Sequence, residues 1–338
     1  MYARVLMVVG CIGIALFCSR GSAAQTTKPT TAPGKVTYDL GGKYKAGQRL
    51  LLTATWGTQA SLAGDKDNAD DPADVLHSYS HTLELPVSVS PSGTPGDVNV
   101  QLTMRRMAYT YNSGDRIMEM DSDRPETLPD QVAESMMIGA RIHAVLDKAG
   151  KAKTITPDDT YLAKPYYANM KPARRAREVQ SQCDILSYFL TQPWAYMPNR
   201  PVAIGDSWAV MRTSYMVPIL AMRVDMDDDG MPVPRPPKED VQCSLKEIEK
   251  TRRGTVATIA IVGKIEVPQD MSGEFQDIDI DVAGTVRLNI DTGELLEHHM
   301  EITAARDGMN IRCTATTTLK RQPTSQPATA PATAPSKS

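Results

Sequence analysis

The feature that most limits how this chain can fold is a two-residue alternation of apolar and polar side chains along much of its length. The pattern is clearest in "HTLELPVSVS", "DVNVQLTMRRM", "ARIHAVLD", "TVATIAIVGKIEV", "DIDIDVAGTVRLNID" and "LLEHHMEI". Successive side chains of a β-strand point to opposite faces of a sheet, so this period predicts strands with one buried face. Turn residues at 112–115 and 291–293 separate the segments. These short spacings favour antiparallel meanders over parallel crossover units.

The strand pattern occurs twice in the same order. "KAGQRLLLTATW" (45–56) corresponds to "AIGDSWAVMRTSY" (203–215), and each is a Gly-led turn followed by a strand. The offset between Gly47 and Gly205 equals the offset between Gly96 and Gly254, which lie in the turns of the next hairpins. Further along, "IGARIHAVLDKAGKAKTI" is matched by "AGTVRLNIDTGELLEHHMEI". We interpret this as a degenerate tandem duplication.

The strongest helix signal, "KPARRAREVQSQCDILSYFLTQPW", lies between the two halves. Pro172 suits a first-turn position. Apolar residues recur at three and four positions and form one stripe: Ala176, Val179, Cys183, Leu186 and Leu190. A helix with one apolar stripe is expected to lie across a sheet face and cover it.

The predicted fold is mainly β (α+β), with two similar antiparallel meander halves and this amphipathic helix packed on them. Whether the halves form one curved, half-barrel-like sheet or two domains stays open. The predicted segments are a signal peptide (1–24), a flexible linker (25–35), a first β half (36–168), the linking helix (169–195), a second β half (196–321) and a Thr/Pro/Ala tail (322–338).

The N-terminus has the order of a secretory signal peptide. Arg4 precedes an apolar run from Val5 to Cys18, and the small residues Ser22-Ala23-Ala24 follow. We therefore expect cleavage after Ala24 and export to the periplasm or the extracellular space, with no transmembrane span afterwards. The segments "QTTKPTTAPGK" and "RQPTSQPATAPATAPSKS" contain almost no apolar bulk, which is typical of spacers without a packed core.

Charge and cysteine content limit the partners and the cross-links. A formal net charge of -3 gives no electrostatic case for a nucleic-acid partner. After signal removal the chain keeps Cys183, Cys243 and Cys313, an odd number that allows at most one internal disulfide. Cys243 with Cys313 is the first candidate pair. The alternative is three unpaired thiols acting as small core residues.

The tripeptide at 205–207, Gly-Asp-Ser, is the one that opens the nucleophile turn of GDSL-type hydrolases. In that family the serine lies near the mature N-terminus, and an Asp-x-x-His pair follows near the C-terminus. Here Ser207 is deep in the chain and precedes a strand pattern, and the Asp74-x-x-His77 pair comes before it. The internal repeat aligns Ser207 with Arg49. A duplicated structural turn explains the tripeptide better, so no catalytic residue is assigned and a hydrolase is the least favoured function.

One loop has part of a calcium-binding pattern. Asp225, Asp227 and Asp229 stand at the first, third and fifth positions of such a loop, with Gly230 at the sixth. Pro236 replaces the closing glutamate, so these three aspartates are a weak calcium candidate and a solvated acidic loop is the alternative. No other cofactor is indicated. His77 and His81 have the spacing of a zinc-protease helix, but that motif needs Glu after the first His and position 78 is Ser. We therefore expect exposed positions for the histidines: His77, His81, His143, His298 and His299.

Methionine is abundant in this Phe-poor chain. Thioether side chains fill irregular cores, and they also line adaptable apolar pockets. The candidate lining of an apolar site between the sheet and the linking helix is Met104, Met107, Leu186, Leu190 and Met211.

Five short stretches resemble a family of exported bacterial β-rich proteins that is classed as a domain of unknown function. They are "KYKAGQRL", "MDSD" (120–123), "LDKAG" (146–150), "VAIGDSW" (202–208) and "AGTVRLNIDTGELLE" (283–297). The resemblance implies a β-rich envelope or secreted protein and supplies no catalytic residue. A looser likeness, at the level of fold alone, is to the half-barrel sheets of periplasmic lipoprotein carriers.

From the sequence we therefore expect an exported, non-catalytic protein of the cell envelope that binds an apolar or lipid-like ligand. The alternative is a structural component whose partner is another envelope protein and which holds no small ligand.

Overall fold

The computed structural model describes residues 35–41, 44–62, 75–113, 116–124, 126, 137–148, 150–163, 167, 170–213, 238–266, 279–306 and 309–322. The predicted signal peptide, the acidic loop with Asp225, Asp227 and Asp229, and the tail from residue 323 lie outside these residues.

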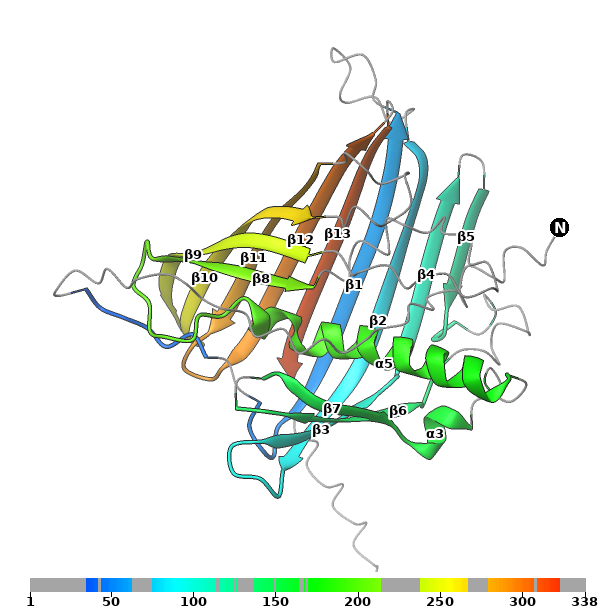
Figure 1. Cartoon of the computed structure of the whole chain (residues 1–338), viewed down its shortest axis with the longest axis horizontal. Helices are drawn as coiled ribbons and strands as arrows, with labels where there is room; N and C mark the ends of the chain where they lie inside the picture. Colours follow the sequence, from blue (N-terminus) through cyan, green and yellow to red (C-terminus); the bar gives the residue numbers. More distant parts are fainter. Residues whose placement is uncertain are drawn as a thin grey trace, which may run out of the picture.

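The described strands form one antiparallel sheet of 13 strands, which is not closed (Figure 1). This confirms the mainly β fold class. In chain order the strands are β1 (Arg49–Leu62), β2 (Val75–Pro91), β3 (Val98–Thr103), β4 (Arg106–Ser113), β5 (Arg116–Asp121), β6 (Arg141–Leu146), β7 (Ala152–Pro157), β8 (Ser207–Thr213), β9 (Lys238–Thr251), β10 (Gly254–Glu266), β11 (Ile280–Asn289), β12 (Glu294–Arg306) and β13 (Met309–Arg321).

The order of strands in the sheet repeats once. From one edge to the other it is β7-β6-β3-β2-β1-β13-β12-β11-β10-β9-β8, and the β4–β5 hairpin pairs with β2 beside this path. The sheet thus has two arms of five strands, β1-β2-β3-β6-β7 and β8-β9-β10-β11-β12. In each arm the strands lie side by side in the order in which they occur in the arm's sequence. Strand β13 joins the two arms by pairing with both β1 and β12. The two predicted halves therefore share one continuous sheet.

The turns that open the two arms have the same geometry. Gly47 and Gly205 both have a φ of 88°, a left-handed conformation that glycine adopts without strain. In the first arm the N–H of Gly47 donates to the Val89 carbonyl (2.8 Å). In the second arm the N–H of Gly205 donates to the Leu245 carbonyl (2.9 Å). The Gly-Asp-Ser tripeptide therefore occupies a turn that also occurs at the start of the first arm.

The two-residue alternation in the sequence gives the sheet two different faces. On β1 the side chains of Leu50, Leu52, Ala54 and Trp56 are buried, whereas Thr55 between them is exposed. We call the face with Trp56 the inner face and the face with Thr55 the outer face. The inner face carries the hydrophobic core.

Helix α5 (Pro172–Ala195) crosses the inner face (Figure 1), and the short helix α3 (Asp159–Leu162) precedes it. A proline lies in its first turn, as predicted. The predicted stripe is buried from Val179 onward, but Ala176 is exposed, so contact with the sheet begins about one turn later than expected. Phe189 packs its ring against that of Trp56, with 5.0 Å between the ring centroids.

Both arms of the sheet reach the C-terminal end of α5. Trp194 packs against Gly150, in the turn between β6 and β7, where a Cβ atom would lie 3.2 Å from the indole ring. Just beyond the helix, the Tyr196 hydroxyl donates to Oε2 of Glu239 on β9 (2.8 Å). The sheet is therefore curved around the helix like an open half-barrel.

Cys243 and Cys313 are free thiols, and like Cys183 they are buried. Cys313 lies on β13 and Cys243 on β9, with β10, β11 and β12 between these strands in the sheet. The candidate disulfide between them does not form, because adjacent strands alone are about 4.8 Å apart and this separation spans four such steps.

The contact between Phe189 and Trp56 predicts a large loss of stability when the ring is removed. Phe189→Ala is expected to lower the free energy of unfolding by about 3–5 kcal/mol, because the variant leaves a cavity between helix and sheet. Urea denaturation measures this, with Val262→Ala as control. Val262 is 62% exposed, so its truncation should cost within about 0.5 kcal/mol. Equal costs for the two variants would show that α5 is not anchored at Phe189.

Candidate functional site

A second apolar cluster lies on the inner face, separate from the main core. The β4–β5 hairpin places Tyr109 beside Met120, and Tyr111 beside Met118, in neighbouring cross-strand pairs. On the other side of β4, Tyr109 pairs with His81 of β2 and Tyr111 pairs with Tyr79. We call this set of six side chains the aromatic surface: Tyr79, His81, Tyr109, Tyr111, Met118 and Met120.

Ring contacts connect the aromatic surface to the main core. His81 is stacked on Trp56, with centroids 4.9 Å apart and planes inclined by 3°, and it also lies 4.6 Å from Tyr109. Tyr79 meets His81 edge-on at 5.6 Å. These separations are in the range in which aromatic pairs attract each other. The row from Phe189 through Trp56 and His81 to Tyr109 is therefore continuous.

The aromatic surface is only partly covered. Tyr109 and Met120 are buried, whereas Tyr79, Tyr111 and Met118 are half-buried. An antiparallel sheet with a polar outer face normally packs its apolar face against another layer. Side chains of this size that stay partly accessible on the inner face mark a place where a further apolar group can dock.

The aromatic surface carries no charge at neutral pH. Burial lowers the pKa of His81 to about 4, so its imidazole is neutral. Burial raises the pKa of Tyr109 to about 12 and keeps its hydroxyl protonated. The Thr58 hydroxyl donates to the Tyr79 hydroxyl (2.9 Å) and also lies 2.9 Å from Cys313 Sγ. The surface can therefore offer apolar contact and neutral hydrogen-bonding groups.

A buried polar cluster lies at the C-terminal end of α5. Arg212 of β8 donates from Nε to Oε2 of Glu239 on β9 (2.7 Å), and the Tyr196 hydroxyl donates to the same oxygen. The guanidinium lies over the Tyr196 ring at 4.2 Å and the Tyr188 ring at 5.3 Å. Glu239 is fully buried and the Arg212 side chain is 13% exposed. The two charges thus neutralise each other inside the half-barrel.

His298 belongs to the same cluster. Its ring lies 5.4 Å from that of Tyr196 and is fully buried. Burial, reinforced by the Arg212 charge, lowers the pKa of His298 to about 3. Both ring nitrogens lack a hydrogen-bond partner among the described residues, as do the Thr317 hydroxyl and Oε1 of Gln192.

The expectation of exposed histidines is wrong for three of the five, because His298 is buried and His81 and His299 are half-buried. His298 is on the inner face of β12, and His81 is on the inner face of β2, because the strand period places both beside buried apolar residues. His77 is exposed, and the His143 side chain is 49% exposed. His299, adjacent to His298, points to the outer face and contacts the Thr316 hydroxyl at 3.0 Å.

Four of the five predicted lining residues lie in the main core or pack against it. Met104, Leu186 and Leu190 are buried in the main core, and Met107 packs against it. Met211 is 52% exposed. It lies on the face of β8 opposite Trp208, which is buried, so it does not join the other four.

The remaining sequence candidates find no support in the described part of the chain. Ser207 is the exposed first residue of β8 and pairs with Ser244 of β9. The calcium candidates Asp225, Asp227 and Asp229 are not among the described residues. Within the described ranges no group of three His, Cys, Asp or Glu side chains is placed to hold a metal ion. No helix in these ranges is long and apolar enough to cross a membrane.

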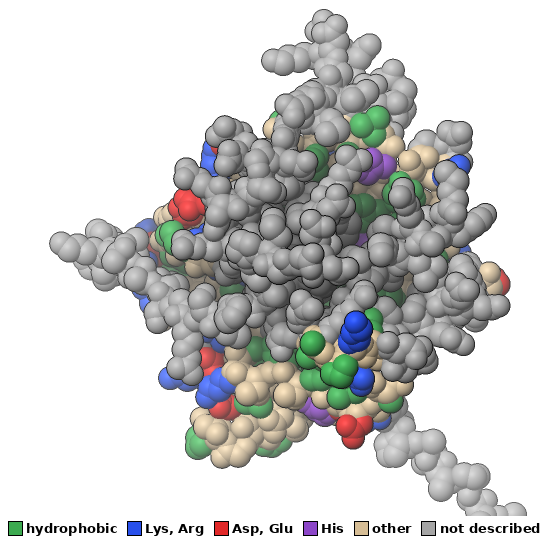
Figure 2. Space-filling model, turned by 45° about the vertical axis from the view of Figure 1, so that its right-hand side comes forward, with side chains coloured by type: hydrophobic (Ala, Val, Ile, Leu, Met, Phe, Trp, Pro, Cys, Tyr) green, Lys and Arg blue, Asp and Glu red, His purple; other side chains and the backbone are tan. Residues whose placement is uncertain are grey.

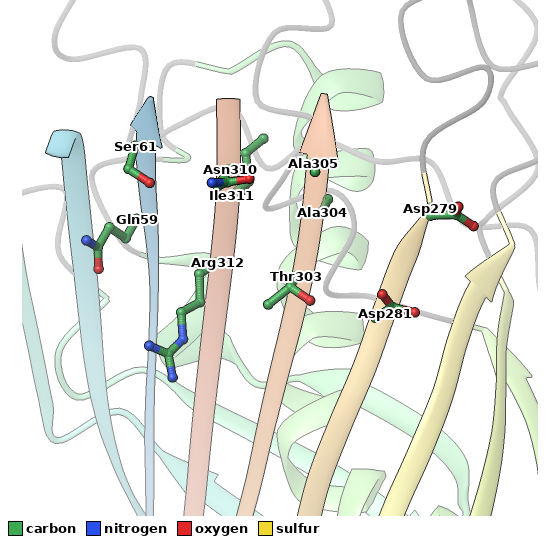
Figure 3. A pocket seen from close by; sticks show the side chains of 10 residues that line it. All are labelled: Gln59, Ser61, Asp279, Asp281, Thr303, Ala304, Ala305, Asn310, Ile311 and Arg312. Carbon is green, nitrogen blue, oxygen red and sulfur yellow. The ribbon is translucent and has the colours of Figure 1, made fainter. Parts of the chain in front are cut away.

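Two hollows in the surface are polar. One, of about 610 Å³, lies at the ends of β1, β11, β12 and β13, where Figure 3 shows Gln59, Arg312, Thr303 and Asp281 on neighbouring strands. Arg312 is already paired with Glu301 (2.7 Å). The other hollow, of about 320 Å³, includes Ser and Thr side chains of β2 and β7. Positive and negative side chains are mixed on the coloured surface in Figure 2. Neither hollow is therefore suited to an apolar ligand.

Sequence reasoning missed the aromatic surface. The signal was present in "HSYSHT" and in "MAYTYNSGDRIMEM", where large side chains alternate with polar ones on both sides of a turn. Pairing those segments across residues 112–115 places Tyr109 and Tyr111 opposite Met120 and Met118. The site is therefore recognisable from the hairpin, but its pairing with β2 is not local.

Comparison with known proteins gives no family assignment. No protein-family model matches the chain, and no curated protein matches it. Among solved structures, DynF from the dynemicin biosynthesis pathway of Micromonospora chersina is 8% identical, with a TM-score of 0.18 over 92% of this chain and 96% of that chain. The translocator domain of the autotransporter NalP from Neisseria meningitidis is 6% identical, with a TM-score of 0.24 over 83% and 91%. A Bacteroides fragilis protein described as exported and YmcC-like is 8% identical, with a TM-score of 0.17 over 80% and 95%. Scores this low do not establish a shared fold.

The ion pair in the polar cluster predicts non-additive mutational effects. Glu239→Leu leaves the Arg212 charge without its partner and should cost about 3 kcal/mol or more of stability. The double variant Arg212→Met, Glu239→Leu removes both charges and should cost less than Glu239→Leu alone. Chemical denaturation of the wild type, both single variants and the double variant measures this coupling. Additive losses would mean that the two side chains do not form the buried pair.

The lowered pKa of His81 predicts a pH-dependent stability. The unfolded chain binds a proton at this residue near pH 6.5 and the folded chain only near pH 4, so stability is lost as pH falls between these values. His81→Phe keeps the ring and removes the titration. Because His81 is partly exposed, the wild type should lose only about 1–2 kcal/mol more than this variant between pH 7 and pH 4.5. His77→Phe, at an exposed site of the same strand, is the control. Parallel pH profiles for all three proteins would contradict the burial of His81.

Proposed function

We propose that this chain is an exported, non-catalytic binding protein of the cell envelope or its surroundings, of the β-rich family that it resembles, and that it holds an apolar or lipid-like molecule on the inner face of its sheet. The observation that carries the proposal is the aromatic surface. Its half-buried members, Tyr79, Tyr111 and Met118, continue the apolar inner face beyond the packed main core.

The composition of this surface suits a flexible apolar ligand. Tyrosine rings offer broad flat contact areas with few rotatable bonds, and the thioethers of Met118 and Met120 can adapt to ligands of different shape. The neutral state of His81 removes a charge that an apolar molecule would otherwise have to desolvate.

Helix α5 lies along one side of the proposed site. Phe189 contacts Trp56, and Trp56 is stacked on His81, so the helix side chains border the aromatic surface on the side of the main core. A ligand on Tyr79 and Tyr111 would lie beside this border, where the exclusion of water adds to binding.

The alternative, a structural or protein-interaction component, is favoured by a different observation. The residues of the main core beneath α5 are almost completely buried, and the two hollows described above are lined mainly by polar side chains. Under this alternative, the aromatic surface would be covered by another envelope protein. A hydrolase has no comparable support, because the tripeptide containing Ser207 is explained by the turn that it forms.

Two adjacent residues of β5 separate the proposals. Met118 belongs to the aromatic surface, whereas its neighbour Ile117 is 67% exposed and points to the opposite face. Met118→Gln should weaken binding of the neutral fluorescent probe 1-N-phenylnaphthylamine about tenfold, because it places an amide in the apolar contact. Ile117→Gln, the matched control, should change the dissociation constant less than about twofold.

The purified wild type provides the complementary measurement. Native mass spectrometry should detect an apolar molecule that copurifies with the protein. A wild type that carries no such molecule and does not bind the probe would exclude the ligand-binding function and favour the structural alternative.

A further inference from the structure

The β4–β5 hairpin carries four of the six residues of the aromatic surface, and it is joined to the rest of the sheet through β4. Strand β4 pairs with β2, whereas among the described strands β5 pairs with β4 alone. A strand with one neighbour has fewer contacts than a strand with two and opens more readily. Met118 and Met120 keep their places beside the tyrosines of β4 only while β5 stays paired.

The hairpin is closed covalently at one end alone. Residues 114 and 115 connect the two strands there, between Ser113 and Arg116, which are opposite each other. At the other end, β4 begins with Arg106 and β5 ends with Asp121. Because the chain does not connect the strands at this open end, non-covalent contacts have to hold β5 against β4.

One guanidinium closes the open end of the hairpin. Arg106 donates from Nε to Oδ1 of Asp121 (3.0 Å) and from Nη2 to Oδ2 (2.7 Å), so it binds both carboxylate oxygens. From Nη1 it donates to Oε1 of Glu84 on β2 (3.1 Å). Two parallel bonds of this kind fix the geometry of a contact as well as strengthening it. Arg106 therefore links β2, β4 and β5, the three strands that carry the whole aromatic surface.

The Asp121 carboxylate is well shielded from water. Its side chain is 5% exposed, and hydrogen bonding to Arg106 holds its pKa well below the usual range, so the pair is ionised at neutral pH. Nε of Arg124 also lies 3.5 Å from Asp121, but it belongs to the same chain segment and links no further strand. The Asp123 carboxylate is 53% exposed and 3.6 Å from Arg106, and an ion pair this exposed contributes little.

The ion pair does not belong to the aromatic surface. Met107 packs against the main core and Met120 is buried in the second cluster, so both point to the inner face. Their sequence neighbours Arg106 and Asp121 point to the outer face, because successive side chains of a strand alternate. The pair can therefore affect a ligand on the inner face only through the position of β5.

We propose that Arg106 is the positioning residue of the aromatic surface: it holds the end of β5 against β4 and β2 and thereby keeps both methionines beside the tyrosines of β4. When this contact is lost, β5 separates from β4 starting at Asp121, and Met120 is the first member of the surface to leave its place. This inference rests on the proposed function and adds a residue that controls the affinity without touching the ligand.

A matched pair of substitutions tests the effect on binding. Asp121→Asn removes the charge that Arg106 binds, so a fraction of the molecules has β5 displaced, and the affinity for 1-N-phenylnaphthylamine should fall about fivefold. Arg106→Met also releases Glu84 and should weaken binding at least as much. Asp123→Asn makes the same chemical change at an exposed carboxylate, and it should alter the dissociation constant less than about twofold.

Hydrogen exchange distinguishes local opening from a general loss of stability. In Asp121→Asn, the amides of β5 that bond to β4 should exchange about tenfold faster than in the wild type, whereas the exchange of β11, in the other arm, should not change. An ion pair that contributed only to overall stability would instead accelerate exchange in both strands alike.

A covalent cross-link can take the place of the ion pair. Thr110 of β4 and Glu119 of β5 are opposite each other on the outer face, within the reach of a disulfide. In the Asp121→Asn background, Thr110→Cys together with Glu119→Cys should restore the wild-type affinity for the probe once the disulfide has formed. The reduced form of the same protein is the matched control and should keep the weakened affinity.

The outcomes separate the two proposals. If the wild type binds the probe and Asp121→Asn binds it equally tightly, or if the disulfide does not restore the affinity that Asp121→Asn has lost, Arg106 is not a positioning residue. If the wild type does not bind the probe, the proposed binding function itself is wrong, and faster exchange of β5 in Asp121→Asn would then show a purely structural ion pair.

Discussion

The structure depends on the meeting of both arms of the sheet at the last turn of α5. Trp194 contacts the first arm at Gly150, and Tyr196 is central to the contact with the second arm. The Tyr196 hydroxyl donates to Glu239, its carbonyl accepts from Nε1 of Trp208 (2.8 Å), and its ring contacts the Arg212 guanidinium and the His298 ring. One residue thus touches β8, β9 and β12. A twisted antiparallel sheet coils by itself, but its curvature is set by whatever it packs against. A buried ion pair is costly unless every partner is in place, so this contact allows little variation in the curvature.

That arrangement divides the inner face into two parts with different uses. Beneath the C-terminal half of α5 the sheet is filled, from Leu190 and Phe189 to Trp56. The β4–β5 hairpin branches from β2 outside the main path of the sheet, and its apolar side chains form their own cluster. An open half-barrel therefore combines a stable core with an accessible apolar surface.

Much of this architecture could be predicted from the sequence because it is local. The strand period, the proline at the start of α5 and the paired turns at Gly47 and Gly205 all act over a few residues, and each is found where it was expected. The position of β13 between the arms and the pairing of β4 with β2 are contacts between distant segments, which no local pattern encodes. The exposed position of Met211 could not be predicted either, because the strand period shows which residues share a face but not which face is the inner one.

Two pairs of polar residues lie on the inner face, where the alternation of the sequence predicts apolar side chains. The two pairs differ in their hydrogen bonding. Arg212 and Glu239 occupy inner-face positions on the neighbouring strands β8 and β9, yet they satisfy each other. His298 and Thr317 occupy equivalent positions in the middle of the sheet and satisfy nothing in the described chain. The satisfied pair is therefore explained by the structure, whereas nothing in the described chain explains the unsatisfied pair. The distinction depends on hydrogen bonding alone, since all four side chains are polar and lie on the same face.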